Sequence, residues 1–199
     1  MKVLFVCTGN TCRSPMAEAL LSEKNSDVEV QSAGLFAMNQ QKANEHTIKV
    51  LKEQGIMIDH YSQPVTNELL EWADIVLTMT TQHKQSLILQ FPHHQDKYFT
   101  LKEYVSETDK KIWDKLKKAY ADYEEKRSIF IQENEKKLSS IELDKKLATR
   151  FKNDIEKIEQ LEASLINYDI SDPFGGDLEI YRKTLQEIDK YINLLNKKI

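Results

Sequence analysis

Hydrophobic residues in the first hundred positions alternate between short runs and helical spacing. The short runs cover residues 3–6, 28–30, 75–77 and 98–99, with Glu29 between two valines in the second. Between them, apolar residues recur every three to four positions around residues 16–24, 42–54, 66–72 and 82–91. Short apolar strands that alternate with amphipathic helices are typical of α/β proteins. The pattern therefore predicts a parallel sheet covered by helices on both faces.

A last amphipathic helix is predicted near the C-terminus, over about residues 178–195. Its apolar residues form one stripe at a spacing of three to four: Ile180, Tyr181, Leu185, Ile188, Ile192 and Leu195. A helix with such a stripe can bury it against the predicted sheet.

Residues 106–167 have a different composition. In this segment 28 of 62 residues are charged, 14 basic and 14 acidic, against 32 of the other 137. Apolar residues still recur at helical spacing, and Ser139 with Glu142 fits a capping box at the start of a second helix. The segment is therefore predicted to be an inserted helical hairpin, with two arms of about 25 residues that would each be ~38 Å long.

The sequence leaves the role of this hairpin open. It could be a surface embellishment without function, or an arm for dimerisation or partner binding. A disordered charged linker fits less well, because the apolar spacing is regular and the segment is longer than most structureless loops.

Charge and hydropathy exclude several classes of function. The chain of 199 residues has a net charge of −4 and no long basic run, so it lacks the basic patch that nucleic acid requires. It has no apolar stretch near ~18 residues, and the apolar run after Lys2 is too short for a signal peptide. We therefore expect a cytoplasmic protein without a nucleic-acid or membrane partner.

The clearest candidate for chemistry is the loop after the first predicted strand. It runs from Cys7 through Gly9 to Arg13, and Pro15 then suits the first turn of a helix. A loop between a strand and a helix N-terminus directs backbone N–H groups and the positive end of the helix dipole at one point. A phosphate group could bind there, with Arg13 gripping its oxygens and Cys7, favoured as a thiolate, attacking it. Ser14 could donate a hydrogen bond to the cysteine sulfur.

Longer motifs link this loop to a known family. The run VCTGNTCRSPMAE over residues 6–18 resembles the signature loop of the low-molecular-weight protein tyrosine phosphatases, and QSAG at 31–34 and ADIVLTM at 73–79 extend the match. The resemblance implies a three-layer, Rossmann-like α/β fold with a four-stranded parallel sheet. It also implies a phosphatase domain made of residues 1–105 and 168–199, with residues 106–167 inserted.

The same resemblance assigns roles near the C-terminus. The run DPFGG at residues 172–176 is similar to the loop that carries the general acid in this family, which points to Asp172. A positioned acid contributes about 10²–10⁴ in rate when the leaving group is strongly basic. Phe174 would then form a wall at the entrance to the site.

The implied reaction has two steps. Cys7 attacks phosphorus and forms a phosphocysteine, Asp172 protonates the leaving atom, and Asp172 then serves as the base for water. Arg13 and the loop amides balance the charge, so no metal or cofactor is needed. The remaining predicted phosphate-binding residues are Thr8, Gly9, Asn10, Thr11, Cys12 and Ser14, and Asn10 is expected to adopt a left-handed backbone conformation.

Thr11 bears on the identity of the substrate. In the family that this sequence resembles, tyrosine phosphatases usually carry a larger aliphatic residue at this position, whereas bacterial protein arginine phosphatases carry threonine. A hydroxyl can pair with the guanidinium N–H groups of phosphoarginine. We therefore expect a phosphatase of phosphorylated proteins that acts on phosphoarginine. A tyrosine phosphatase and a phosphoprotein-binding module that recruits partners through its hairpin are the alternatives.

Two further interpretations concern cysteine and histidine. Cys12 either pairs reversibly with Cys7 under oxidation or is a small packing residue. Thiol-coupled arsenate reduction is disfavoured, because that family uses further cysteines and this chain has none after Cys12. The five histidines are scattered and do not predict a metal site.

Overall fold

A computed structural model describes residues 1–106, 108–134, 137–163 and 167–199 of the chain. The chain divides into two compact units. The first consists of Met1–Val105 and Tyr168–Ile199, and the second of Ser106–Asn167.

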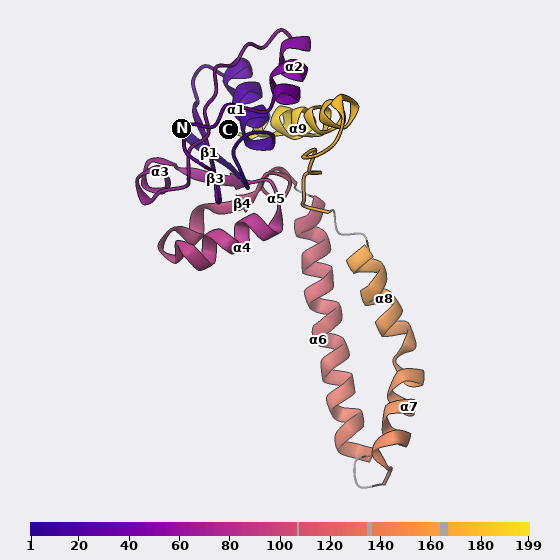
Figure 1. Ribbon diagram of the computed structural model, residues 1–199. Coiled ribbons are helices and arrows are strands. Elements are labelled where there is room, and N and C mark those ends of the chain that lie inside the picture. Colours follow the sequence, from indigo (N-terminus) through magenta and orange to yellow (C-terminus); the bar gives the residue numbers. More distant parts are fainter. Residues whose placement is uncertain (107, 135–136, 164–166) are drawn as a thin grey trace. The chain divides into compact units, whose positions relative to one another are not determined.

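The first unit is built on a parallel sheet with the strand order β2-β1-β3-β4. Three of these strands, β1, β3 and β4, are labelled in Figure 1. The strands are β1 (Lys2–Cys7), β2 (Glu29–Gly34), β3 (Ile75–Thr78) and β4 (Tyr98–Thr100). In the register, Phe5 of β1 lies beside Ser32 of β2 and Leu77 of β3. The predicted four-stranded parallel sheet is thereby confirmed.

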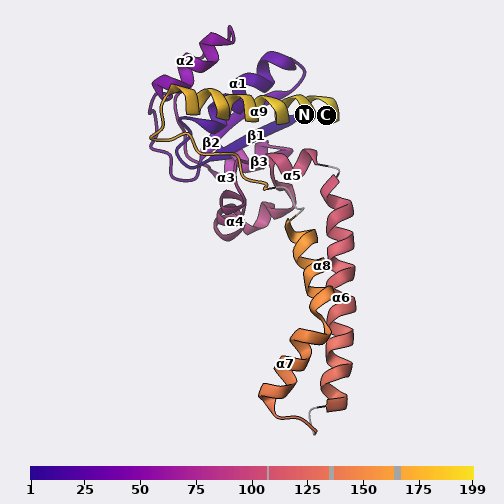
Figure 2. The ribbon, with the colours of Figure 1, turned by 90° about the vertical axis from the view of Figure 1, so that its right-hand side faces the viewer.

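Helices cover both faces of this sheet (Figure 2). Successive side chains of a strand point to opposite faces, so β1 contributes Val3 and Phe5 to one buried cluster and Leu4 and Val6 to the other. The first cluster is completed by α1 (Arg13–Lys24), α2 (Glu45–Glu53), α5 (Leu101–Val105) and α9 (Leu178–Lys198). The second is completed by α3 (Asn67–Trp72) and α4 (Thr81–Gln90). The three-layer prediction is confirmed.

Two features of this unit differ from the hydrophobic pattern. Strand β2 continues past the predicted 28–30 to Gly34, because the polar Ser32 is buried with hydrogen-bond partners. The 3₁₀ helix η1 (Pro92–Lys97) and helix α5 were not predicted. Helix α5 does carry a local signal, since Thr100 and Glu103 each accept the other's backbone N–H as in a capping box.

The second unit is helical, with α6 (Thr108–Asn134), α7 (Ser140–Arg150) and α8 (Lys152–Ala163). Helix α6 packs against α8 through Leu116, Ala119 and Ile158. The capping box of Ser139 and Glu142 is confirmed at the start of α7. Among the helices of the described ranges, none is long and apolar enough to cross a lipid bilayer.

The second arm of the hairpin is two helices rather than the single helix that was predicted. Helix α7 ends at Arg150, and the residue that caps it, Phe151, is 5% exposed. Its ring meets Tyr123 and Phe130 edge-on, with centroid distances of 5.9 Å to each. This packing accounts for the break, because the apolar spacing alone runs through it without interruption.

Candidate active site

The predicted nucleophile lies at the C-terminal end of β1, where the chain turns through residues 8–12 into α1. Cys7 is 3% exposed, and its Sγ is 3.0 Å from Ser14 Oγ. The backbone N–H of Asn10 donates to the same sulfur over 3.3 Å. Because α1 starts at Arg13, the sulfur also lies near the positive end of a helix dipole, which favours negative charge there.

A cavity of about 320 Å³ opens beside this sulfur. Its lining brings together most of the residues that the sequence singled out: Cys7, Thr8, Gly9, Thr11, Cys12, Arg13, Asp172 and Phe174. Gln41 also lines the cavity and was missed by the sequence analysis. The two other predicted residues, Asn10 and Ser14, are buried and hydrogen-bond to each other beneath the loop.

Asn10 holds the shape of the loop. It has φ = 54°, the left-handed conformation that was predicted. Its side-chain amide donates to Ser14 Oγ at 3.0 Å and to Ser32 Oγ at 2.8 Å, and its Oδ1 accepts from Gln63 N at 2.9 Å. The carbonyl oxygen of Asn10 accepts from His60 Nε2 at 3.0 Å. These contacts leave the loop little freedom to rearrange.

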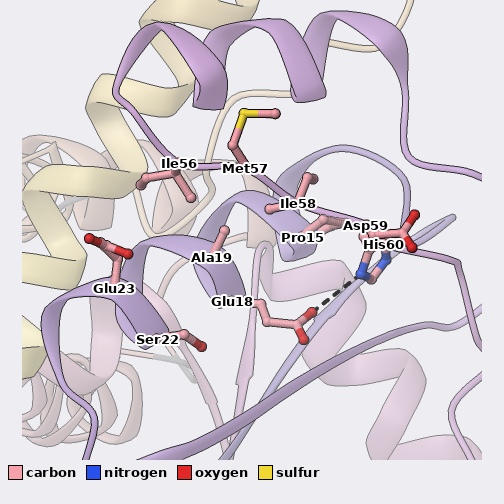
Figure 3. A pocket seen from close by; sticks show the side chains of 10 residues that line it. All are labelled: Pro15, Glu18, Ala19, Ser22, Glu23, Ile56, Met57, Ile58, Asp59 and His60. Carbon is pink, nitrogen blue, oxygen red and sulfur yellow. Dashed lines mark ion pairs between the residues drawn. The ribbon is translucent and has the colours of Figure 1, made fainter.

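Glu18 and His60 form an ion pair (Figure 3), and each also contacts a residue that holds the loop. Glu18 Oε2 accepts from Ser32 Oγ at 2.5 Å and lies 3.5 Å from His60 Nδ1. Burial raises the pKa of Glu18, although the Ser32 hydrogen bond and the nearby His60 act in the opposite direction. The pair forms part of the wall of a second cavity, of about 330 Å³, which does not contain Cys7.

Gly34 is required where β2 passes under the loop. A Cβ atom on Gly34 would lie 2.6 Å from the carbonyl oxygen of Thr8 and 2.9 Å from the backbone nitrogen of Asn10. Both are backbone atoms that cannot move without deforming the loop. In the sequence this glycine stands out only as the last residue of the QSAG motif.

Arg13 and Asp172 come together across the cavity. Arg13 is 4% exposed, and its Nη2 donates to Asp172 Oδ2 at 2.7 Å. Its Nη1 also donates to the carbonyl oxygen of Ile170 at 3.4 Å. The Asp172 side chain is 53% exposed, and its Oδ1 accepts from Phe174 N at 3.2 Å. Phe174 itself is largely exposed at the rim.

His83 contacts the loop, which the sequence did not predict. Its Nε2 is 2.8 Å from Thr8 Oγ1. Burial lowers the pKa of His83 to about 4; the charge of Arg13 acts in the same direction, and Asp172 and Asp169 oppose it. The ring is therefore neutral near pH 7. Its Nδ1 has no hydrogen-bond partner within the described part of the chain, so we assign the ring proton to Nε2, where it donates to Thr8.

Cys12 lies beside the last helix. Its Sγ is 3.4 Å from Tyr181 Oη. The pKa of Tyr181 is raised mainly by burial and, to a smaller extent, by this hydrogen bond. Both cysteines are reduced in the structure. In the described ranges, no three His, Cys, Asp or Glu side chains are grouped as ligands for a metal ion.

Comparison with protein families gives one clear match. The model described as low molecular weight phosphotyrosine protein phosphatase matches residues 2–149. This range includes the whole Cys7 to Arg13 loop and the supporting residues on β2 and α1.

Individual relatives match over the whole chain. A protein-arginine-phosphatase of Bacillus subtilis is 44% identical over 203 aligned residues, which cover 100% of this chain and 97% of the relative. The solved structure of the YwlE arginine phosphatase from Geobacillus stearothermophilus is 35% identical with a TM-score of 0.68, covering 99% of this chain and 91% of that one. A cysteine-to-serine mutant of YwlE arginine phosphatase with a phosphorylated active site serine is 35% identical with a TM-score of 0.67, covering 100% and 95%.

Proposed function

Since the chain belongs to the low molecular weight phosphotyrosine protein phosphatase family and is a phosphoprotein phosphatase, we propose that its substrates are proteins phosphorylated on arginine. The observation that carries the chemistry is a single cavity. It holds the Cys7 sulfur at the start of α1, the Arg13 guanidinium and the Asp172 carboxyl.

In this proposal Cys7 is the nucleophile. The hydroxyl of Ser14 and the amide of Asn10 lie at 3.0 and 3.3 Å from its sulfur and stabilise the thiolate. Arg13 has five N–H donors, so it can bind phosphoryl oxygens while it holds Asp172 and Ile170. Attack of the sulfur forms the S–P bond and breaks the bond from phosphorus to the leaving nitrogen or oxygen.

Asp172 is the proton donor to that leaving atom. It lines the same cavity as Cys7, and its half-exposed side chain is accessible to substrate and water. After the leaving group departs, the Asp172 carboxylate takes a proton from water, and the resulting hydroxide displaces the sulfur from phosphorus. The cycle returns free phosphate, the thiolate and a protonated Asp172.

Thr11 supports arginine as the phosphorylated residue. It lines the cavity together with Cys7, and its Oγ1 is 3.6 Å from Cys12 Sγ. A hydroxyl at this position can accept hydrogen bonds from a guanidinium, whereas an aliphatic side chain would leave those N–H groups unpaired at about 1–3 kcal/mol each. The relatives named as protein-arginine-phosphatases match over the full chain, which favours the same substrate.

We further propose that the chemistry resides in residues 1–105 and 168–199 and that residues 106–167 contact a partner or a second copy. The proposal is supported by the cavity lining, in which every residue belongs to the first unit. Helix α6 also presents the partly exposed apolar side chains Tyr120 and Ile129.

The first test of the proposed function is a Cys7→Ser variant. We expect this variant to bind inorganic phosphate about as well as the wild type, because Arg13 and the loop amides remain, but to lose turnover of phosphoarginine peptides. Retained turnover would show that another group is the nucleophile. Loss of both turnover and anion binding, in a protein that keeps its wild-type circular dichroism spectrum, would show that Cys7 is needed to bind the anion, and would contradict the assignment of phosphate binding to Arg13 and the loop amides alone.

A further inference from the structure

The segment that leads into the Asp172 loop is fixed to the core at consecutive residues. Ile170 N donates to the carbonyl oxygen of Met79 at 2.8 Å, and the Ile170 carbonyl accepts from Arg13. One residue earlier, the carbonyl oxygen of Asp169 accepts from Lys102 Nζ at 2.7 Å. The backbone before Asp172 is therefore tied both to the end of β3 and to helix α5.

Glu187 on helix α9 extends this anchoring to the residue directly before Asp172. Its Oε2 accepts two hydrogen bonds from Ser171, at 3.2 Å from the backbone nitrogen and 2.7 Å from Oγ. Its Oε1 forms an ion pair with Lys102 at 2.7 Å. Thr184, one helical turn earlier on α9, adds a contact of 3.2 Å between its hydroxyl and that of Ser171.

The Lys102 side chain is well placed to hold Glu187 rigidly. It is 7% exposed, and its ammonium lies 5.3 Å from the centre of the Tyr191 ring. Burial raises the pKa of Glu187, but the hydrogen bonds from Lys102 and Ser171 and the charge of Lys102 together bring it below its ordinary value. The carboxylate thus keeps its charge and its bonds to Ser171 even in mildly acidic solution.

Asp172 has little side-chain packing of its own, since it is half exposed. Its position depends on its contact with Arg13 and on the backbone that Ser171 fixes. A catalytic group must be held within about 0.5 Å of its productive position, and a displacement of ~1 Å can cost about 10² in rate. The anchoring of Ser171 therefore bears on proton transfer.

We propose that Glu187, held by Lys102, is a positioning residue for the acid step. It fixes the backbone at Ser171 so that Asp172 keeps its carboxyl beside the leaving atom of the substrate. The proposal rests on the function proposed above, in which Asp172 donates that proton.

A leaving-group series separates this role from a purely structural one. The probes are para-nitrophenyl phosphate, whose leaving group needs little protonation, and phenyl phosphate, whose leaving group needs much more. In Glu187→Ala we expect kcat/KM for phenyl phosphate to fall about tenfold further than kcat/KM for para-nitrophenyl phosphate. Inhibition by inorganic phosphate should stay within about twofold of wild type, because Arg13 and the loop are unchanged.

The matched control is Asp189→Asn on the same helix. Asp189 pairs with Lys24 at 3.1 Å and touches neither Ser171 nor the cavity. Its loss should leave both substrates at wild-type rates. If Glu187→Ala does not fold, Glu187→Gln keeps one acceptor oxygen for Ser171 and should show the same selective loss to a smaller degree.

A double variant decides whether Glu187 acts through Asp172. We expect Asp172→Asn to lower the phenyl phosphate rate selectively, and Asp172→Asn with Glu187→Ala to be no slower than Asp172→Asn alone. Two results would overturn the positioning role. In the first, the falls in kcat/KM of the two single variants multiply in the double variant. In the second, Glu187→Ala lowers kcat/KM equally for both substrates. If Asp172→Asn itself lacks the selective loss, the acid assignment of the proposed function fails instead.

Discussion

The buried His83 makes the stability of the protein depend on pH. Its pKa is about 4 in the folded state, because burial and the charge of Arg13 outweigh the attraction of Asp172 and Asp169, against an ordinary value of 6.5. Between these values the unfolded chain binds a proton that the folded chain does not. Stability from this residue is therefore complete above the unfolded pKa and is lost as the pH falls toward about 4. The difference of about 2.5 units corresponds to about 3 kcal/mol.

A His83→Gln variant isolates this effect. Glutamine does not titrate, and its amide N–H can still donate to Thr8 Oγ1. We expect the wild type to lose about 3 kcal/mol relative to the variant between about pH 7 and about pH 4, measured by urea unfolding at each pH. The difference between the two proteins cancels the contribution of the other titratable groups. Parallel stability curves over this range would refute the argument that His83 is held neutral by burial.

Three other predictions follow from local geometry. Gly34→Ala should destabilise the protein by about 1–3 kcal/mol in thermal unfolding and weaken inhibition by phosphate, because the new Cβ would lie 2.6 Å from the Thr8 carbonyl oxygen. Unchanged inhibition by phosphate would argue against a rigid loop. Ser139→Ala should cost helix α7 about 1 kcal/mol, seen as faster hydrogen exchange there, with para-nitrophenyl phosphate hydrolysis unaltered. Replacing residues 106–167 with a flexible linker should also preserve that hydrolysis. Its loss, in a variant that still unfolds cooperatively on heating, would show that the activity needs the second unit.

The parts of the site that could be predicted from the sequence are those encoded locally. Cys7, Arg13 and the start of α1 lie within a few residues, so one strand, one loop and one helix fix their arrangement. Asp172 lies 159 residues from Arg13, and only the resemblance of its loop to a family motif pointed to it. The start of α5 could also have been predicted, because Thr100 and Glu103 have the spacing of a capping box.

The contacts that support the loop could not be predicted in this way. His60 and Gln63 reach Asn10 from 50 and 53 residues away, and no periodic pattern relates those positions. Of these supporting residues, Glu18 could have been predicted from the sequence, because it lies four residues after Ser14 on the same face of α1. The break at Phe151 is of the same kind, because ring packing across the hairpin, and not local propensity, decides where α7 ends.

The substrate is identified by measuring phosphate release from two matched peptides, one with phosphoarginine and one with phosphotyrosine, under reducing conditions and without added metal. We expect faster release from the phosphoarginine peptide, and a preference that weakens in Thr11→Ile because the guanidinium loses its hydroxyl partner. A preference of the wild-type protein for the phosphotyrosine peptide, or release from neither, would contradict the proposed function.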